Sequence, residues 1–241
     1  MSLSFEHIDH QFTPIGQISL RRRRYPATGD LDVYEVKLGE EFLMSSLFVE
    51  AEEQLADLGL AAVHGDALSV VVGGLGLGYT AVAALNCSRV QEMLVVETLQ
   101  PVIDWHRQGK VPLGATLNAD DRCRFVQGSF FDLALDPAQG FDPAQPGRLF
   151  DAILLDIDHS PTALLNPSNA GFYTPEGLAA LTRQLRPGGV FALWSNDPPD
   201  AHFMGLLGDL FLNVRSHVVA FDNPFRQTQS TNTVYVARLG I

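Results

Sequence analysis

The segment from Leu68 to Gly78 constrains the fold more than any other part of the chain. It joins a short apolar run, Leu68-Ser-Val-Val-Val72, to a glycine-rich turn. The run is typical of a parallel strand covered on both faces, and glycines let the backbone turn tightly and approach a ligand closely. A helix is expected to start at Thr80, and the next strand, Val90–Glu97, ends in a carboxylate that can bind ribose hydroxyls. The pattern predicts a nucleoside site whose ligands are Gly73, Gly74, Gly76, Gly78 and Glu97.

Two other interpretations of this segment stay open. A glycine turn can be purely structural, and Glu97 can be a solvated carboxylate at a strand end. A nicotinamide dehydrogenase would show Gly-x-Gly-x-x-Gly, whereas this loop has Gly74-x-Gly76-x-Gly78. That spacing disfavours binding of a pyrophosphate.

The composition is that of an ordinary globular protein of 241 residues, with 46% hydrophobic and 18% charged residues. The net charge of −12 argues against a nucleic-acid partner, because phosphate binding needs a concentrated positive field. The two cysteines, Cys87 and Cys123, exclude a disulfide framework and a cysteine-rich metal site, and no metal is expected. No apolar run reaches the roughly 20 residues of a membrane span, and the N-terminus lacks the pattern of a secretory signal. A cytoplasmic location and no membrane partner are expected.

Strand and helix patterns alternate along most of the chain, which predicts an α/β, doubly wound, mostly parallel Rossmann-like sheet. The last two strands, Val214–Phe221 and Thr233–Leu239, have no helix pattern between them and predict a closing antiparallel hairpin. Helices are expected at Leu99–Gln108 and Pro175–Leu185. The expected parallel strands are Leu68–Val72, Val90–Glu97, Cys123–Gln127, Phe150–Ile157 and Val190–Trp194. A proline-containing stretch, 135–147, is expected to be an exposed loop.

The first part of the chain predicts a small β-strand region, residues 1–45, ahead of a nucleoside-binding domain, residues 46–241. Strands are expected at Gly16–Arg24 and Asp32–Leu38. The run Arg21–Arg24 favours a solvated edge strand or a subunit contact over an anion site. An amphipathic helix is expected over 45–60, with Glu50, Glu52 and Glu53 on its solvated face.

The whole pattern resembles the spermidine synthase family within the class I methyltransferase fold. The matching pieces are Val-Val-Val-Gly73-Gly74-Leu-Gly76-Leu-Gly78, Phe150-Asp-Ala-Ile-Leu-Leu-Asp156-Ile-Asp158, Gly171-Phe-Tyr-Thr-Pro-Glu-Gly-Leu178 and Leu185-Arg-Pro-Gly-Gly189. The resemblance implies a transferase of polyamine biosynthesis that uses decarboxylated S-adenosylmethionine and an amine or polyamine acceptor. It also implies a homodimer.

The candidate catalytic residues follow from this resemblance and from their positions. Asp156 ends an apolar strand and can orient the acceptor amine and accept its proton, since an alkyl ammonium with a pKa of about 10.4 must be deprotonated before it attacks. Asp158 can hold a second cationic end, while Tyr79 and Tyr173 can line the pocket. Ser129 is expected to contact the adenine. The simpler alternatives are a turn-capping role for Asp156, Asp158 and Ser129 and ordinary packing for the tyrosines.

The chain also departs from the family pattern. Gly76 stands where the family carries an aspartate that holds the free amine of the decarboxylated ligand, and Asp158 follows Asp156 by two positions rather than three. The histidine-containing acidic motif of the connecting helix is absent, although an acidic residue of this helix can still face the pocket. Three hypotheses follow: an aminopropyltransferase, a small-molecule methyltransferase that uses intact S-adenosylmethionine, and a non-catalytic nucleoside- or polyamine-binding relative. The segment from Ser160 to Gly171 is the candidate lid.

Overall fold

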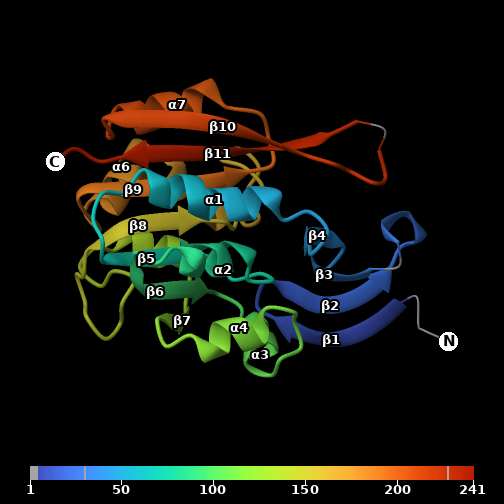
Figure 1. Ribbon diagram of the computed structural model, residues 1–241. Coiled ribbons are helices and arrows are strands. Elements are labelled where there is room, and N and C mark those ends of the chain that lie inside the picture. The colour runs from blue at the N-terminus through green and yellow to red at the C-terminus, as the bar shows by residue number, and fades with distance from the viewer. Residues whose placement is uncertain (1–4, 30, 227) are drawn as a thin grey trace.

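The computed structural model describes residues 5–29, 31–226 and 228–241, which form two β-sheets and their surrounding helices (Figure 1). The smaller sheet lies at one end of the molecule and faces the carboxyl ends of the parallel strands in the larger sheet. Within the described ranges, no helix is long and apolar enough to cross a membrane.

The N-terminal sheet has four antiparallel strands in the order β1-β2-β3-β4. They are β1 (Phe5–Thr13), β2 (Gly16–Arg24), β3 (Asp32–Leu38) and β4 (Glu41–Ser45). The expectation that Arg21–Arg24 forms an edge strand was wrong, because β2 pairs with β1 on one side and β3 on the other. Carboxylates on both neighbouring strands compensate the arginine charge, as in the pairs Arg22–Glu6 (2.6 Å) and Arg21–Glu35 (3.0 Å).

The larger sheet has seven strands in the order β10-β11-β9-β8-β5-β6-β7. Strands β5 to β9 are parallel, whereas β10 and β11 form an antiparallel hairpin that joins the sheet through β9. This confirms the predicted doubly wound sheet and its closing hairpin. The strands are β5 (Leu68–Gly73), β6 (Val90–Glu97), β7 (Cys123–Gln127), β8 (Phe150–Leu155), β9 (Leu185–Ser195), β10 (Asn213–Phe221) and β11 (Ser230–Arg238).

Helices cover both faces of the larger sheet, as its buried apolar strands require. One face packs against α1 (Glu50–Ala61), α2 (Tyr79–Asn86), α3 (Gln100–Arg107) and α4 (Gly114–Ala119). The other carries an aromatic-rich core beneath α5 (Phe130–Leu135), α6 (Pro175–Thr182) and α7 (Ala201–Gly208). Two short 3-10 helices, Pro26–Thr28 and Pro167–Tyr173, lie in loops.

The stretch 135–147 differs from the expected exposed loop. It has no helix or strand after Leu135, but Phe141 and Asp142 within it are fully buried. Asp142 forms ion pairs with Arg124 (2.8 Å) and Arg148 (3.0 Å), and Phe141 stacks on Phe130. Its prolines and glycines predicted an exposed loop, whereas these tertiary contacts fix it against the sheet.

Candidate active site

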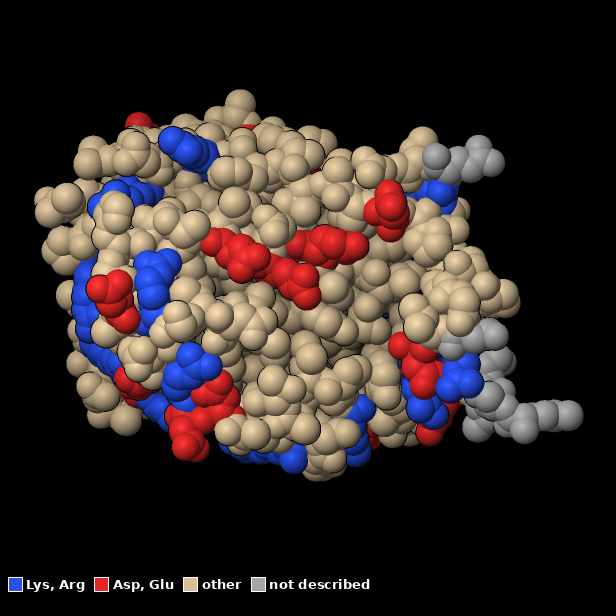
Figure 2. Space-filling view, viewed as in Figure 1, with Lys and Arg blue, Asp and Glu red and all other residues tan. Residues whose placement is uncertain are grey.

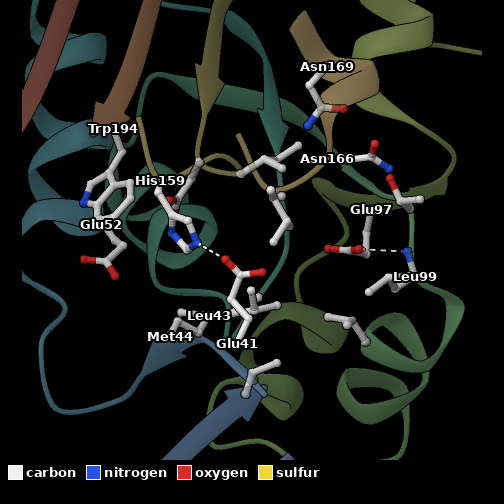
Figure 3. A pocket seen from close by; sticks show the side chains of 18 of the residues that line it. Glu41, Leu43, Met44, Glu52, Glu97, Leu99, His159, Asn166, Asn169 and Trp194 are labelled. Carbon is white, nitrogen blue, oxygen red and sulfur yellow. Dashed lines mark hydrogen bonds and ion pairs between the residues drawn. The ribbon is translucent and has the colours of Figure 1, made fainter. Parts of the chain in front are cut away.

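A cavity of about 780 Å³ lies where the carboxyl ends of the parallel strands meet the N-terminal sheet. Its walls include residues of β4, of the first turn of α1, of the ends of β10 and β11, and of the loops that follow β5 to β9. Figure 3 labels the lining residues that come from β4, α1, β9 and the loops after β6 and β8. Six titratable residues line it: Glu41, Glu52, Glu97, Asp132, Asp156 and His159. None of the described lining residues is a lysine or an arginine. Acidic side chains also gather outside the cavity over α1 (Figure 2), whose exposed acidic residues are Glu50, Glu53 and Asp57.

The glycine loop between β5 and α2 contributes Gly74 and Gly76 to the cavity wall. Both have positive φ, +93° and +47°, which non-glycine residues rarely adopt. A side chain at Gly74 would collide with the Asp156 carbonyl, and one at Gly76 would collide with the Met44 sulfur. Met44 Sδ also accepts a hydrogen bond from the Leu77 N–H (3.1 Å). The thioether of β4 therefore fills the space that a side chain at position 76 would enter.

The two outer glycines of the predicted motif serve packing. Gly73 lies against the Phe130 ring, and Gly78 against His106 and Leu117. Neither Gly73 nor Gly78 is part of the cavity wall. They let the loop pack closely on its neighbours, while Gly74 and Gly76 leave the backbone open to a ligand.

Glu97, at the end of β6, lines the cavity and joins two loops. Its carboxylate accepts hydrogen bonds from the Leu75 N–H (3.0 Å) and the Leu99 N–H (2.8 Å, Figure 3). Burial raises the pKa of Glu97, although these backbone hydrogen bonds oppose the rise. Ser129 also lines the cavity, and its hydroxyl caps α5 by accepting the Asp132 N–H (3.2 Å). Of the predicted nucleoside ligands, Glu97 and Ser129 thus line the same cavity as Gly74 and Gly76.

Asp156 follows β8 and lines the cavity together with Glu52, and its backbone carbonyl lies against Gly74. Its carboxylate accepts a hydrogen bond from the Thr80 hydroxyl (2.9 Å), and burial raises its pKa to about 6. Glu52, in the first turn of α1, is only 8% exposed. Burial, together with the nearby Asp156 charge, raises the pKa of Glu52 to about 9. Burial and their mutual repulsion therefore disfavour the ionisation of both carboxyl groups at the same time.

The position of Glu52 corrects the expectation that it belongs to a solvated face. Glu50 and Glu53 are exposed as expected, but Glu52 falls on the buried stripe that also contains Ala56 and Leu60. Its spacing of four from Ala56 and eight from Leu60 was the available signal, because residues so spaced share a helix face.

Glu41 and His159 form a cavity-lining pair that sequence patterns did not indicate. Glu41 Oε1 lies 2.7 Å from His159 Nε2, and this contact joins the N-terminal sheet to the loop after β8. In Figure 3 the pair lies between Glu97 on one side and Glu52 with Trp194 on the other. The two residues are 118 positions apart, so only the tertiary structure brings them together.

The structure places three of the candidate catalytic residues, Asp158, Tyr79 and Tyr173, outside the cavity wall. Asp158 is 2% exposed and accepts hydrogen bonds from the Leu165 N–H (2.7 Å), the Asn169 amide (2.8 Å) and the Tyr173 hydroxyl (2.9 Å). Tyr79 is half-buried against the core at the start of α2. Asp158 and Tyr173 therefore shape the candidate lid, which lines the cavity through Leu165, Asn166, Ser168 and Asn169.

Among the residues that the structure describes, no group of three His, Cys, Asp or Glu side chains is arranged to hold a metal ion.

Comparison with known proteins supports the fold. No family model matches the chain, and no curated protein matches it. A spermidine synthase structure in complex with the transition-state analogue AdoDATO matches 98% of this chain and 74% of its own, with 19% identity and a TM-score of 0.73. The spermidine synthase from Thermotoga maritima matches 98% and 73%, with 19% identity and a TM-score of 0.72.

A methyltransferase structure is similar over a smaller part of the chain. Human methyltransferase-like protein 13 in complex with SAH matches 79% of this chain and 78% of its own, with 17% identity and a TM-score of 0.53. The chain therefore has the Rossmann-like fold that spermidine synthases share with class I methyltransferases, as the sequence pattern predicted.

Proposed function

We propose that this protein is a spermidine synthase-like transferase that moves an aminopropyl group from decarboxylated S-adenosylmethionine to an amine acceptor. The observation that carries the proposal is the charge of the cavity. Five carboxyl groups and one histidine line it, with no lysine or arginine among its described lining residues. A sulfonium and an alkyl ammonium are both cations, and such a wall favours them over a ligand that carries a carboxylate.

The nucleoside is assigned to the end of the cavity that contains Glu97, Gly74, Gly76 and Ser129. Glu97 would accept hydrogen bonds from the ribose hydroxyls, since each carboxylate oxygen has a second lone pair beyond the one that binds a backbone N–H. The glycines would allow close approach of the backbone, and Ser129 would contact the adenine. When bound there, the sulfonium ligand supplies an electrophilic carbon.

Asp156 is assigned the role of general base. It would accept the proton that the acceptor ammonium must lose, after which the free nitrogen forms the new C–N bond as the C–S bond breaks and the thioether leaves. Burial raises the pKa of Asp156 from 3.8 to about 6 and so brings it closer to that of the amine. The shift narrows the unfavourable gap for proton transfer by about 3 kcal/mol. The Thr80 hydroxyl would hold the carboxylate in place.

Calorimetric titration with decarboxylated S-adenosylmethionine, intact S-adenosylmethionine and methylthioadenosine tests the ligand class. We expect the decarboxylated form to bind at least about tenfold more tightly than the intact form, because the described lining residues include no lysine or arginine that could pair with a carboxylate. Methylthioadenosine, the product common to aminopropyl transfers, serves as the control for the nucleoside end. Failure of all three to bind would refute the nucleoside assignment of Glu97 and the glycine loop.

The variant Asp156→Asn tests the chemistry. We expect its turnover to fall by about 10²-fold or more with nucleoside affinity retained, because the amide cannot accept the proton. Asp132→Asn is the control, because it also removes one carboxylate from the cavity wall but lies at the nucleoside end. Absence of turnover in the parent protein, despite nucleoside binding, would favour a binding role.

Methyl transfer from intact S-adenosylmethionine is the second candidate, and the Gly76–Met44 contact favours it. The thioether of Met44 fills the space beside Gly76, so position 76 offers no carboxylate to select a free amine. Tighter binding of the intact form in the same titration would make methyl transfer the better assignment.

A further inference from the structure

The region of the cavity around Asp156 has one anionic binding site for a ligand, formed by Glu52 and Asp156. Glu52 and Asp156 both line the cavity, and no hydrogen bond from another described residue to the Glu52 carboxylate is present. Of the three other carboxylates that line the cavity, Glu41 pairs with His159, Glu97 binds backbone N–H groups, and Asp132 lies beside Ser129 at the nucleoside end. Asp158, the sequence-based candidate for a second cation, is buried with three donors of its own.

The rest of this end of the cavity is built from aromatic side chains and amides. Phe48, Trp194 and Phe221 line it, and the rings of Phe48 and Phe221 lie 5.5 Å apart. In the view of Figure 3, Trp194 and Glu52 lie on the same side of the cavity. The amides of Asn196 and Asn232 also line this region and are hydrogen-bonded to each other (3.2 Å). These groups suit an apolar arm, whereas a second ammonium buried among them would lose its hydration without gaining a counter-charge.

We propose that the acceptor is a monoamine with an apolar arm, whose single ammonium binds between Glu52 and Asp156 while the arm packs against Phe48, Trp194 and Phe221. This inference depends on the proposed amine transfer at the same site. It makes Glu52 a binding residue for the acceptor, in addition to Asp156. It also predicts discrimination against diamines, whose second charge would have to leave the cavity or remain unpaired.

The test compares n-hexylamine with 1,5-diaminopentane, which have the same chain length and differ in one end group. Each is titrated calorimetrically into the full-length protein saturated with methylthioadenosine. We expect the dissociation constant of n-hexylamine to be lower than that of the diamine by about tenfold or more. Equal or tighter binding of the diamine would overturn the inference while leaving the nucleoside assignment intact. Failure of methylthioadenosine to bind would refute the proposed function first.

Two variants locate the selectivity. Glu52→Gln should weaken both amines by about tenfold or more, because a bound ammonium favours the ionised form of Glu52 and the amide cannot supply that charge. Asn232→Asp adds a carboxylate to the aromatic end and should narrow or reverse the preference for n-hexylamine. Titration with methylthioadenosine shows whether each variant is folded. An unchanged preference in Asn232→Asp, or unchanged affinities in Glu52→Gln, would contradict the assigned position of the acceptor.

Discussion

Glu52 is a carboxyl group in an environment that disfavours its ionisation. It is almost completely buried, and the charges that act on it are those of Asp156, Glu50 and Glu53, all of the same sign. The pKa of Glu52 in the folded chain, about 9, lies far above the ordinary glutamate value of 4.5. The folded chain therefore keeps a proton that the unfolded chain has already released between these two values.

The stability of the protein should consequently fall as pH rises from about 5 to 9, by at most about 1.4 kcal/mol per pH unit from this group. Glu52→Gln should flatten the profile and raise the melting temperature most at the alkaline end. Asp57→Asn, which changes an exposed acid of the same helix, is the control. If the melting temperatures of the parent and of Glu52→Gln changed with pH in the same way, Glu52 would ionise normally in the folded chain.

The Asp158 carboxylate holds the loop after β8 in place through hydrogen bonds. One carboxylate accepts donors from three points of the segment, at Leu165, Asn169 and Tyr173, and so fixes both halves of the candidate lid. Burial raises the pKa of Asp158, although these hydrogen bonds oppose the rise. Its neighbour His159 instead faces the cavity.

Asp158→Asn should destabilise the fold by about 2–3 kcal/mol, because the amide loses charge-assisted hydrogen bonds in a buried position. Tyr173→Phe removes one of the donors and should cost about 1 kcal/mol. Urea denaturation measures the stability, and limited proteolysis reports on the loop. If Asp158→Asn kept the parent's stability but lost turnover, the catalytic role predicted from the sequence would be the better assignment.

At the scale of the whole molecule, the two sheets are joined by a contact from β1 to α3 and the residues after it. Asp9 accepts hydrogen bonds from the Trp105 indole (2.9 Å) and forms an ion pair with Lys110 (2.7 Å). The adjacent β1–β2 pairing is irregular between His7 and Asp9, and such a bulge re-aims nearby side chains. The N-terminal sheet thereby stays against the large one and closes the cavity.

Asp9→Ala should loosen this junction at a cost of about 1–3 kcal/mol, because a buried indole N–H loses its partner. Trp105 is fully buried and is one of two tryptophans, so in a Trp194→Phe background its emission reports on the junction alone. We expect red-shifted emission and easier quenching in the Asp9→Ala variant. Glu6→Ala breaks a pair within the N-terminal sheet and is the control. Unchanged emission would mean that other contacts hold the sheets together.

The large sheet could be predicted because central strands such as β5 and β8 carry nearly continuous apolar runs, which are typical of a parallel strand covered on both faces. Strands β1 and β4 were not predicted, because β1 mixes polar and apolar residues and β4 has only five residues. The glycine loop, Glu97 and Asp156 follow from their place at strand ends, and the structure brings them to one cavity. Glu52 and the Glu41–His159 pair depend on how distant segments face each other, which local patterns do not encode.

The cavity also bears on the order in which the chain folds. Its wall includes Ile15 near one end of the sequence and Asn232 near the other, with contributions from most of the loops between. Contacts of such long sequence separation form late, since the chain entropy of closing large loops must be overcome before the contacts stabilise it. No fragment short of nearly the full chain contains the complete site. Ligand binding therefore belongs to the last step of folding, and a ligand that binds there would stabilise both sheets at once.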